Sequence, residues 1–500
     1  MRRLANVLMA AAFLPAVAHA DAAKGSSKSS DAVIRKPAMF KFGLERINLS
    51  SNENMGMLGT SYLVEVSPRL YLGPAAYGAI TGQRGGFFTA GGEMAWHQKL
   101  FPRLELQTGI FMGGGGGSSA STMTGGGLMI RPHLDLLWKL GNYQAGISAS
   151  HVSFPNGEIS SNQIGLLFSA DSNFAYVTPD RVGQRMDTKG RHGAGFDRVL
   201  ATVGRYRPRS NVTDLSGAPA TSSIGTVGVR LERLLSPSLY WGLEAAGASS
   251  GNAAGYAEFL GTLGAETPIW DETLAIGARL ALGMGGGGLV SVGGGLLNKL
   301  GTYATVNLSR DTHLSLEGGY ATAPNGKLRA TYGSANFIWD LDHPAASGRG
   351  AVIVGNEWIF GTEHYFDAAY RDGSKRDIDA VVIKLNRYLN RSVYLTGQAH
   401  SAYSGNSGGY SAGLFGAGFR TQKFFDRFSA GAEMLIGAAG GGGLDTSGGA
   451  IVQPMAYLTM DLTKVTGIKL SAGRVKSLKG ALNSNVADLS VNFAFGTSSR

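Results

Sequence analysis

The sequence predicts an all-β protein, a transmembrane antiparallel β-barrel of about 24 strands formed from three eight-stranded repeats. Three observations lead to this prediction. The N-terminus has the pattern of an export signal, the composition is poor in charge and rich in glycine, and one glycine-marked pattern occurs three times along the chain. Polar and apolar residues alternate within each copy, which is typical of strands whose two faces meet different surroundings.

The first 20 residues form a predicted secretory signal peptide. Two arginines near the start are followed by an apolar run and by small residues that end at Ala20. This arrangement predicts export from the cytoplasm of a Gram-negative bacterium, with cleavage near Ala20 and before Asp21. The following residues 21–37 are small and polar and are expected to form a disordered tether.

The composition excludes several classes of site. The chain has no cysteine, so disulfide bonds and cysteine-based metal sites are excluded. Charged residues make up 16% of the sequence, against about 25% in ordinary soluble domains, and 76 of the 500 residues are glycine. After the signal peptide no stretch has the roughly 18 consecutive apolar residues of a spanning helix. We expect no metal, no cofactor and no nucleic-acid partner, and the net charge of +10 selects no ligand class.

Three glycine blocks mark the repeats. They occupy residues 113–117, 285–288 and 440–443, and each is followed by a second, shorter glycine cluster. Glycine permits the backbone angles of tight hairpin ends, so we expect the blocks at the ends of strands. The predicted divisions after the tether are module 1 (38–170), a linker (171–194), module 2 (195–341), a linker (342–349), module 3 (350–496) and a C-terminal tail (497–500).

Charged residues share one face of the predicted strands. Over residues 128–140, apolar residues such as Leu134 alternate with polar residues such as Asp135. A spanning strand needs roughly 9–11 residues, which this segment supplies. The apolar face is expected to meet lipid and the polar face to line the lumen. The candidate pore-lining residues are Arg131, His133, Asp135, Lys139, Arg230, Glu232, Arg279 and Lys299.

Two architectures fit this pattern, one wide barrel of about 24 strands and three small eight-stranded barrels in tandem. We expect the single barrel, because the link after Asp340 looks too short for two barrels to separate. An even number of strands places both chain ends on the periplasmic side and the glycine blocks on the outer side.

One hairpin carries the residues with the clearest chemical potential. An Asn-Gly pair at residues 156–157 predicts a two-residue type I′ turn. This turn would place His151 opposite Asn162, and Ser153 opposite Ser160, on the lipid-facing side at the outer leaflet. A serine and a histidine at this spacing can form a nucleophile and its general base.

This hairpin resembles the lipid A 3-O-deacylases, eight-stranded outer-membrane enzymes with a His-x-Ser pair followed by a glutamate. The resemblance implies that His151 is the base, Ser153 the nucleophile and Glu158 the orienting acid of a lipid A ester hydrolase. The chain departs from that family at Phe154, where the family has asparagine, and at Asn162, which stands opposite the histidine in place of glutamate.

A second resemblance covers more of each module. The segments RGGFFTAGGEMAWHQKL and SGGYSAGLFGAGFRTQK resemble the Gly-Gly-aromatic strand start of exopolysaccharide-secretion barrels of the cellulose-export type. This resemblance implies a polysaccharide cargo and a periplasmic export partner, although the helical-repeat part of those exporters is absent from this sequence.

The expected function is therefore a non-enzymatic channel of the Gram-negative outer membrane, for an exopolysaccharide or for anionic solutes. The alternatives are an outer-leaflet lipid A deacylase-like hydrolase and a surface scaffold that neither conducts nor catalyses. The expected partners are outer-membrane lipid, lipopolysaccharide and the barrel-assembly machinery.

Overall fold

The computed structural model describes residues 33–49, 53–117, 121–186, 196–220, 222–270, 273–309, 311–341 and 351–498. The predicted signal peptide lies outside this part of the chain. The described residues form strands and two short helical turns, α2 (Ser121–Thr124) and the 3₁₀ turn η2 (Pro179–Arg181). Within the described residues, no helix is long and apolar enough to cross a membrane.

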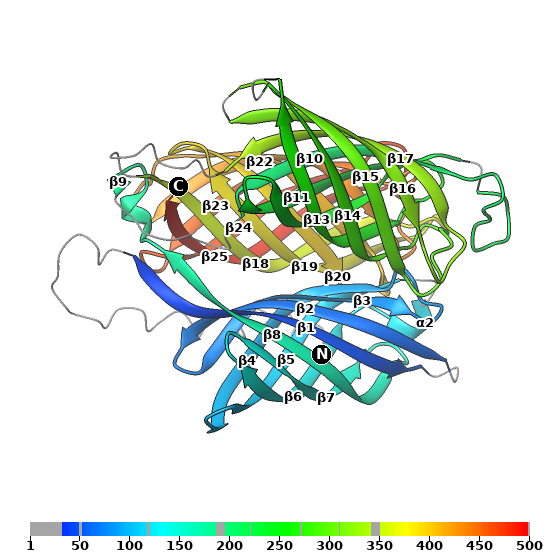
Figure 1. Ribbon diagram of the computed structural model, residues 1–500, viewed down its shortest axis with the longest axis horizontal. Coiled ribbons are helices and arrows are strands. Elements are labelled where there is room, and N and C mark those ends of the chain that lie inside the picture. Colours follow the sequence, from blue (N-terminus) through cyan, green and yellow to red (C-terminus); the bar gives the residue numbers. More distant parts are fainter. Residues whose placement is uncertain are drawn as a thin grey trace.

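The strands form three closed antiparallel barrels of eight strands each (Figure 1). The first contains β1 (Ile34–Asn48), β2 (Asn54–Ser67), β3 (Leu70–Thr81), β4 (Phe88–Phe101), β5 (Leu104–Gly116), β6 (Met129–Leu140), β7 (Tyr143–Ser153) and β8 (Ser160–Tyr176). The second contains β10 (Arg198–Pro208), β11 (Ile224–Ser236), β12 (Leu239–Ser250), β13 (Ala257–Ile269), β14 (Leu274–Gly286), β15 (Leu296–Asn307), β16 (Thr312–Thr322) and β17 (Arg329–Asp340). The third contains β18 (Ala351–Ala369), β19 (Lys375–Tyr388), β20 (Val393–Ala402), β21 (Ser411–Arg420), β22 (Phe428–Gly440), β23 (Ala450–Asp461), β24 (Thr466–Ser477) and β25 (Asn483–Ser498). The short strand β9 (Arg185–Met186) pairs with the start of β18.

The prediction of one wide barrel is wrong, and the alternative of three tandem barrels is confirmed. The first strand of each module pairs with its own last strand, β1 with β8, β10 with β17 and β18 with β25. The short link after Asp340 does not prevent this. Both ends of an even-stranded barrel emerge on the same side, and the ten or so residues before β18 can span roughly 35 Å when extended.

The strands extend beyond the predicted module limits at both ends of the first barrel. Strand β1 begins at Ile34, inside the segment expected to be a tether, and β8 runs on to Tyr176 in the segment expected to be a linker. These extensions pair with each other, Ile34 opposite Tyr176, so each supplies the hydrogen-bond partners of the other. The last strand likewise continues to Ser498, within the predicted tail.

The alternation read from the sequence is present in the structure. Along β6, Arg131, His133 and Asp135 are buried inside the barrel, whereas Leu134 and Leu136 are exposed on its outer wall. The same two-residue period holds along β11 and β23. The pleat of each strand therefore separates a polar interior from an apolar exterior.

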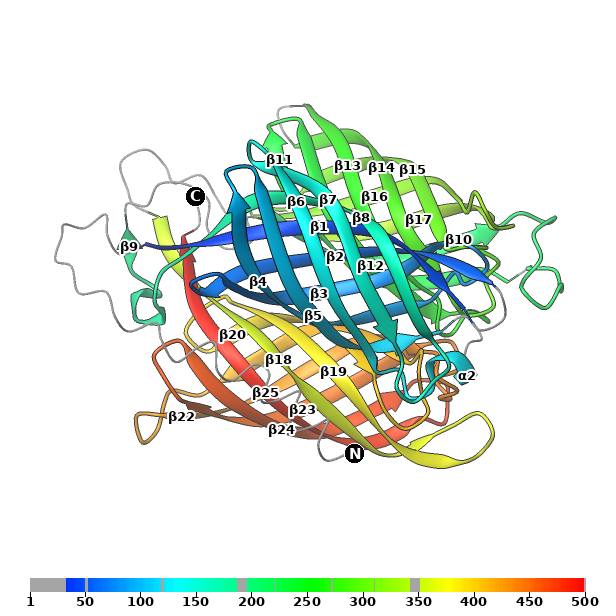
Figure 2. The same cartoon turned by 90° about the horizontal axis from the view of Figure 1, so that it is seen from below.

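The three barrels pack against one another around a common centre (Figure 2). The first barrel contacts the second through β3, which meets β14 and β15, and the second contacts the third through β11 and β12. The third barrel contacts the first through β19 and β20, which meet β4 and β5. Aromatic rings also join these two barrels, with the ring centroids of Phe174 and Trp358 4.8 Å apart.

The glycine blocks lie at strand ends, as predicted, and they also form contacts between neighbouring barrels. A Cβ atom on Gly86, in the β3–β4 loop, would lie 2.2 Å from the backbone nitrogen of Gly287 in the next barrel. The corresponding loops of the other two barrels make the same kind of contact, at Gly255 with the third block and at Gly409 with the first. The loop of each barrel thus packs on the glycine block of the next, and the three contacts close a ring.

This packing predicts that Gly86→Ala destabilises the protein more than Gly373→Ala. Both glycines have a positive φ, 93° and 80°, so both alanines meet backbone strain of about 1–3 kcal/mol. Only at Gly86 does the new Cβ collide with another barrel, because no atom lies within 4 Å at Gly373. Urea unfolding of the two variants in lipid bilayers measures the difference, and equal losses would contradict the proposed contact.

Candidate functional site

The outer walls of the barrels are apolar. Among their most exposed residues are Ile164 at 75%, Leu166 at 66% and Leu316 at 64% relative exposure. The residues between them on the same strands, such as Leu167 and Glu317, face inward and are buried. An apolar outer band around an interior rich in charge is the arrangement of a transmembrane barrel.

In the first barrel, Lys41 of β1 lies at the centre of a buried ion-pair network. Its Nζ lies 2.7 Å from Glu93 Oε1 and 3.1 Å from Asp135 Oδ2. His133 contacts the same two carboxylates, with Nε2 3.4 Å from Glu93 and Nδ1 3.0 Å from Asp135. The structure therefore brings His133 and Asp135 together inside the barrel, where both have interior partners.

Arg131 and Lys139, on the same strand, lie at different depths. Arg131 is buried and pairs with Glu45 of β1. Lys139 lies near the end at which the chain enters and leaves the barrel, and it is only partly buried. Its Nζ lies 3.2 Å from Asp171 Oδ2. Of the four residues predicted on β6, Lys139 is thus the one at a rim.

In the second barrel, Glu317 of β16 joins two arginines. Its Oε1 accepts hydrogen bonds of 2.6 Å from Arg279 Nη2 and from the Tyr332 hydroxyl. Its Oε2 accepts a hydrogen bond of 3.2 Å from Arg230 Nη2. Arg230 also lies 3.5 Å from Glu232, so both residues that the sequence predicted to line the pore on β11 are paired.

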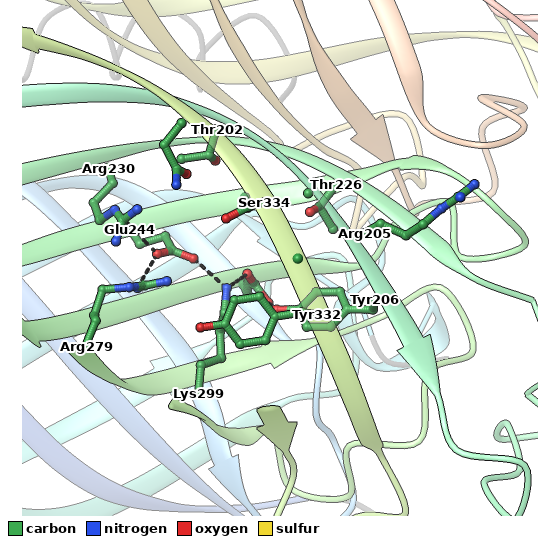
Figure 3. A pocket seen from close by; sticks show the side chains of 15 residues that line it. Thr202, Arg205, Tyr206, Thr226, Arg230, Glu244, Arg279, Lys299, Tyr332 and Ser334 are labelled. Carbon is green, nitrogen blue, oxygen red and sulfur yellow. Dashed lines mark hydrogen bonds and ion pairs between the residues drawn. The ribbon is translucent and has the colours of Figure 1, made fainter. Parts of the chain in front are cut away.

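The same network continues through Glu244 to Lys299. Glu244 accepts hydrogen bonds of 2.6 Å from Arg279 and 2.7 Å from Lys299, both of which point toward it in Figure 3. Lys299 also lies 3.0 Å from Glu258. Beside these groups lies a cavity of about 20 Å³, large enough for a single water molecule.

The third barrel holds interior pairs that the sequence analysis did not name. Lys384 Nζ lies 3.1 Å from Asp488 Oδ2, and Lys469 pairs with Glu433. The internal repeat carried a signal for one of them, because VGVRLER and VVIKLNR align Lys384 with Arg230. Each is the inward-facing cation of the second strand of its barrel.

Apolar side chains fill the outer end of each barrel, which is opposite the end at which the chain enters and leaves it. These residues are buried and come from strand ends and from the loops that fold over them. Ion pairs and apolar packing together therefore close the interiors, as expected for barrels of eight strands. The outer clusters include Met55, Phe111 and Phe154 in the first barrel, Tyr256, Val292, Leu297 and Leu328 in the second, and Tyr365, Leu435, Leu444 and Leu482 in the third.

The predicted pairing of the hairpin between β7 and β8 is present. His151 lies opposite Asn162 and Ser153 opposite Ser160. The predicted type I′ turn is wrong, because no residue of 154–159 has a positive φ and Gly157 N donates to Phe154 O. The reason is Pro155, whose fixed φ suits the second position of a type I or II turn and moves the turn one residue earlier.

His151 and Ser153 both face outward on the lipid side. The Nδ1 of His151 lies 2.7 Å from Asn162 Oδ1, and if Nδ1 donates this hydrogen bond, Nε2 is left as an acceptor. Among the described residues, Ser153 donates no hydrogen bond to His151. Glu158 is exposed in the turn, so the structure brings the histidine to Asn162 rather than to the glutamate.

The described residues include no group of three or more His, Cys, Asp or Glu side chains that could hold a metal ion.

Comparisons with known proteins leave the family open. No protein-family model matches the sequence. No curated protein matches it. Solved structures that align with the chain include OccAB3 of Acinetobacter baumannii, at 10% identity and a TM-score of 0.23 over 92% of this chain and 99% of that one. The siderophore receptor PirA of Pseudomonas aeruginosa aligns at 10% identity and 0.27 over 94% and 81%, and the copper transporter OprC at 10% and 0.29 over 94% and 82%. At these TM-scores the matches carry no argument about function.

Proposed function

We propose that the chain is a channel protein of the Gram-negative outer membrane whose three barrels are closed at rest. The observation that carries this proposal is the burial of ionisable side chains inside barrels with apolar outer walls. Charged groups at membrane depth are costly to bury, and where they occur they commonly mark pathways for ions or protons. The predicted signal peptide and the barrel fold support the location.

The proposed cargo is a small ion or a small anionic solute rather than an exopolysaccharide. An eight-stranded barrel has an interior just wide enough for its own side chains. In the second barrel the cavity beside Arg279 and Lys299 has room for one water molecule. A polymer chain would have to displace the whole ion-pair network, whereas an ion needs only a local rearrangement.

Two barriers hold the second barrel closed in this proposal. Glu317 ties Arg230 and Arg279 together at one level of the interior. Leu297, fully buried, belongs to the apolar cluster at the outer end. Removal of Glu317 would leave both guanidinium groups with one buried carboxylate fewer, and the excess positive charge would draw in water and anions.

The double variant Glu317→Ala/Leu297→Ala is therefore expected to conduct anions in planar bilayers, while the wild type stays closed for most of the recording. Loss of the buried acid is expected to lower the free energy of unfolding by about 3–5 kcal/mol. The control Asp426→Asn removes one exposed carboxylate from a turn and should leave the channel closed. A silent double variant with intact barrels would contradict the channel and favour a non-conducting scaffold.

The hairpin at His151 supports a second candidate function, an outer-leaflet lipid ester hydrolase. The specific observation is the 2.7 Å contact of His151 with Asn162, on a wall that faces lipid. In this candidate, His151 Nε2 takes the proton of Ser153 as its Oγ attacks an ester carbonyl. The serine must rotate toward the ring, and catalytic hydrogen bonds often tighten in this way only when substrate binds.

For this candidate, lipid A from cells that produce the protein should lack an ester-linked acyl chain that is present in cells without it. Ser153→Ala should restore the acylation pattern, with a loss of activity of about 10³-fold or more, as for other serine nucleophiles. Ser160→Ala removes the hydroxyl on the opposite strand and should leave the pattern unchanged. Mass spectrometry of lipid A measures the acylation pattern in cells with the wild type and with each variant. A pattern that the protein does not alter would exclude the hydrolase.

A further inference from the structure

A row of cations lies on the outer rim of the second barrel. Arg205 and Arg207 are exposed on β10, and Arg209 follows the strand. Lys327, in the turn before β17, and Arg329, the first residue of β17, lie beside them. This rim is opposite the end at which the chain enters and leaves the barrel, which is the outer-leaflet end in the proposed orientation.

These cations face outward, away from the ion pairs of the interior. Tyr206, between Arg205 and Arg207, points into the barrel and is buried, so its two neighbours point to the other side of the sheet. In Figure 3, Arg205 extends away from the cavity, whereas Tyr206 and Tyr332 point into it. The row is therefore separate from the proposed conduction path.

In the described part of the chain, the row concentrates positive charge with no carboxylate within ion-pair distance. The backbone nitrogen of Arg209, one residue beyond the end of β10, donates to Arg329 O at 2.9 Å, so this arginine lies level with the first residue of β17. Like charges at directly opposed positions destabilise a sheet. Among the described residues, none of the five cations lies within ion-pair distance of an acid. An anion from outside the chain would supply the missing charge.

Neighbouring contacts hold part of the row in place. Arg329 donates to three backbone carbonyls of the β16–β17 turn, and Lys327 Nζ donates to Thr213 Oγ1 at 3.0 Å. The guanidinium of Arg209 stacks 4.9 Å above the Tyr320 ring. Arg205 and Arg207 have no such partner in the described structure, and their positions two apart on a strand place them roughly 7 Å from each other.

An apolar wall begins directly below the cations. Val203, 60% exposed, precedes Arg205 on the outer face of β10, and Leu316, 64% exposed, lies on β16. Both border a shallow depression of about 550 Å³. Its lining also includes Gly204, Arg205, Gly225 of β11, Ser249 and Ser250 of β12, Glu317 and the small residues 333–335 of β17. Arg205 at the edge of this depression, with the exposed apolar side chains of Val203 and Leu316 beside it, matches a ligand with an anionic head and acyl chains.

This face is turned away from the other two barrels. The second barrel meets the third through β11 and β12 and the first through β14 and β15. Strands β16, β17 and β10 are neighbours in the sheet and form the remaining side of the barrel, and Figure 1 shows β16 and β17 at the edge away from the other two barrels. Lipid can therefore reach the cations together with the part of the depression that lies over β10, β16 and β17.

We propose that this face binds a phosphate-bearing lipid of the outer leaflet. Arg205, Arg207 and Arg209 hold the phosphate through charge-assisted hydrogen bonds, and the acyl chains lie along Val203 and Leu316. The proposal rests on the outer-membrane location proposed above, but not on conduction or hydrolysis.

Native mass spectrometry of protein extracted from a Gram-negative host in mild detergent tests the proposal. The wild type is expected to retain phosphorylated lipid A, and the variant R205S/R207S/R209S to retain at least tenfold less, since charge-assisted hydrogen bonds are the strong ones. The control R474S/K476S/K479S removes three exposed cations from the outer rim of the third barrel. The control is expected to bind as the wild type does, and R205K/R207K/R209K to bind at an intermediate level.

A second arm separates the lipid from free phosphate. Delipidated protein is mixed with vesicles that contain phosphorylated or dephosphorylated lipid A, with and without inorganic phosphate. Binding only to the phosphorylated lipid, with little competition from phosphate, supports the proposal. Equal loss of lipid in the two serine variants, equal binding of both lipids, or complete displacement by inorganic phosphate would overturn it. A silent bilayer recording bears only on the channel, so the two proposals fail separately.

Discussion

The need to satisfy every backbone hydrogen bond within a membrane governs this structure. Hydrocarbon offers no partner for an exposed N–H or carbonyl group, so a spanning sheet must have no free edge. Here the chain meets this requirement three times, because each eighth strand returns to the first strand of its own module. A sheet that closes every eight strands has a narrow interior, and the remaining features of the barrels follow from that size.

A narrow interior explains why the charged residues occur in networks. Inward-facing cations such as Lys41, Arg279 and Lys384 each meet a carboxylate at 2.6–3.1 Å rather than water in a wide lumen. Unpaired, each would be expensive to bury. The outer wall faces lipid and favours apolar side chains. The exposed cations of β10 are an exception, and they indicate a ligand in the membrane. The same wall places His151 and Ser153 where lipid esters are accessible.

The sequence predicted the faces of the strands well and their closure poorly. Alternation placed Arg131, Asp135 and Arg230 on one face of their strands, and that face is buried in the structure, because a two-residue period is a local property of one strand. That period is identical in one barrel of 24 strands and in three of eight, so it could not distinguish them. The ring of glycine contacts at Gly86 and Gly287 depends on packing between barrels, which no local pattern records.

Cysteine cross-linking tests the closure of each module most directly, because the natural chain has no cysteine. Ala38 of β1 and Ser172 of β8 are opposite each other in the closed first barrel. We expect a disulfide in Ala38→Cys/Ser172→Cys and none in Ser172→Cys/Ala201→Cys, which would join β8 to β10. A single barrel would place β8 beside β10, so a cross-link in the second variant and none in the first would contradict the three-barrel structure.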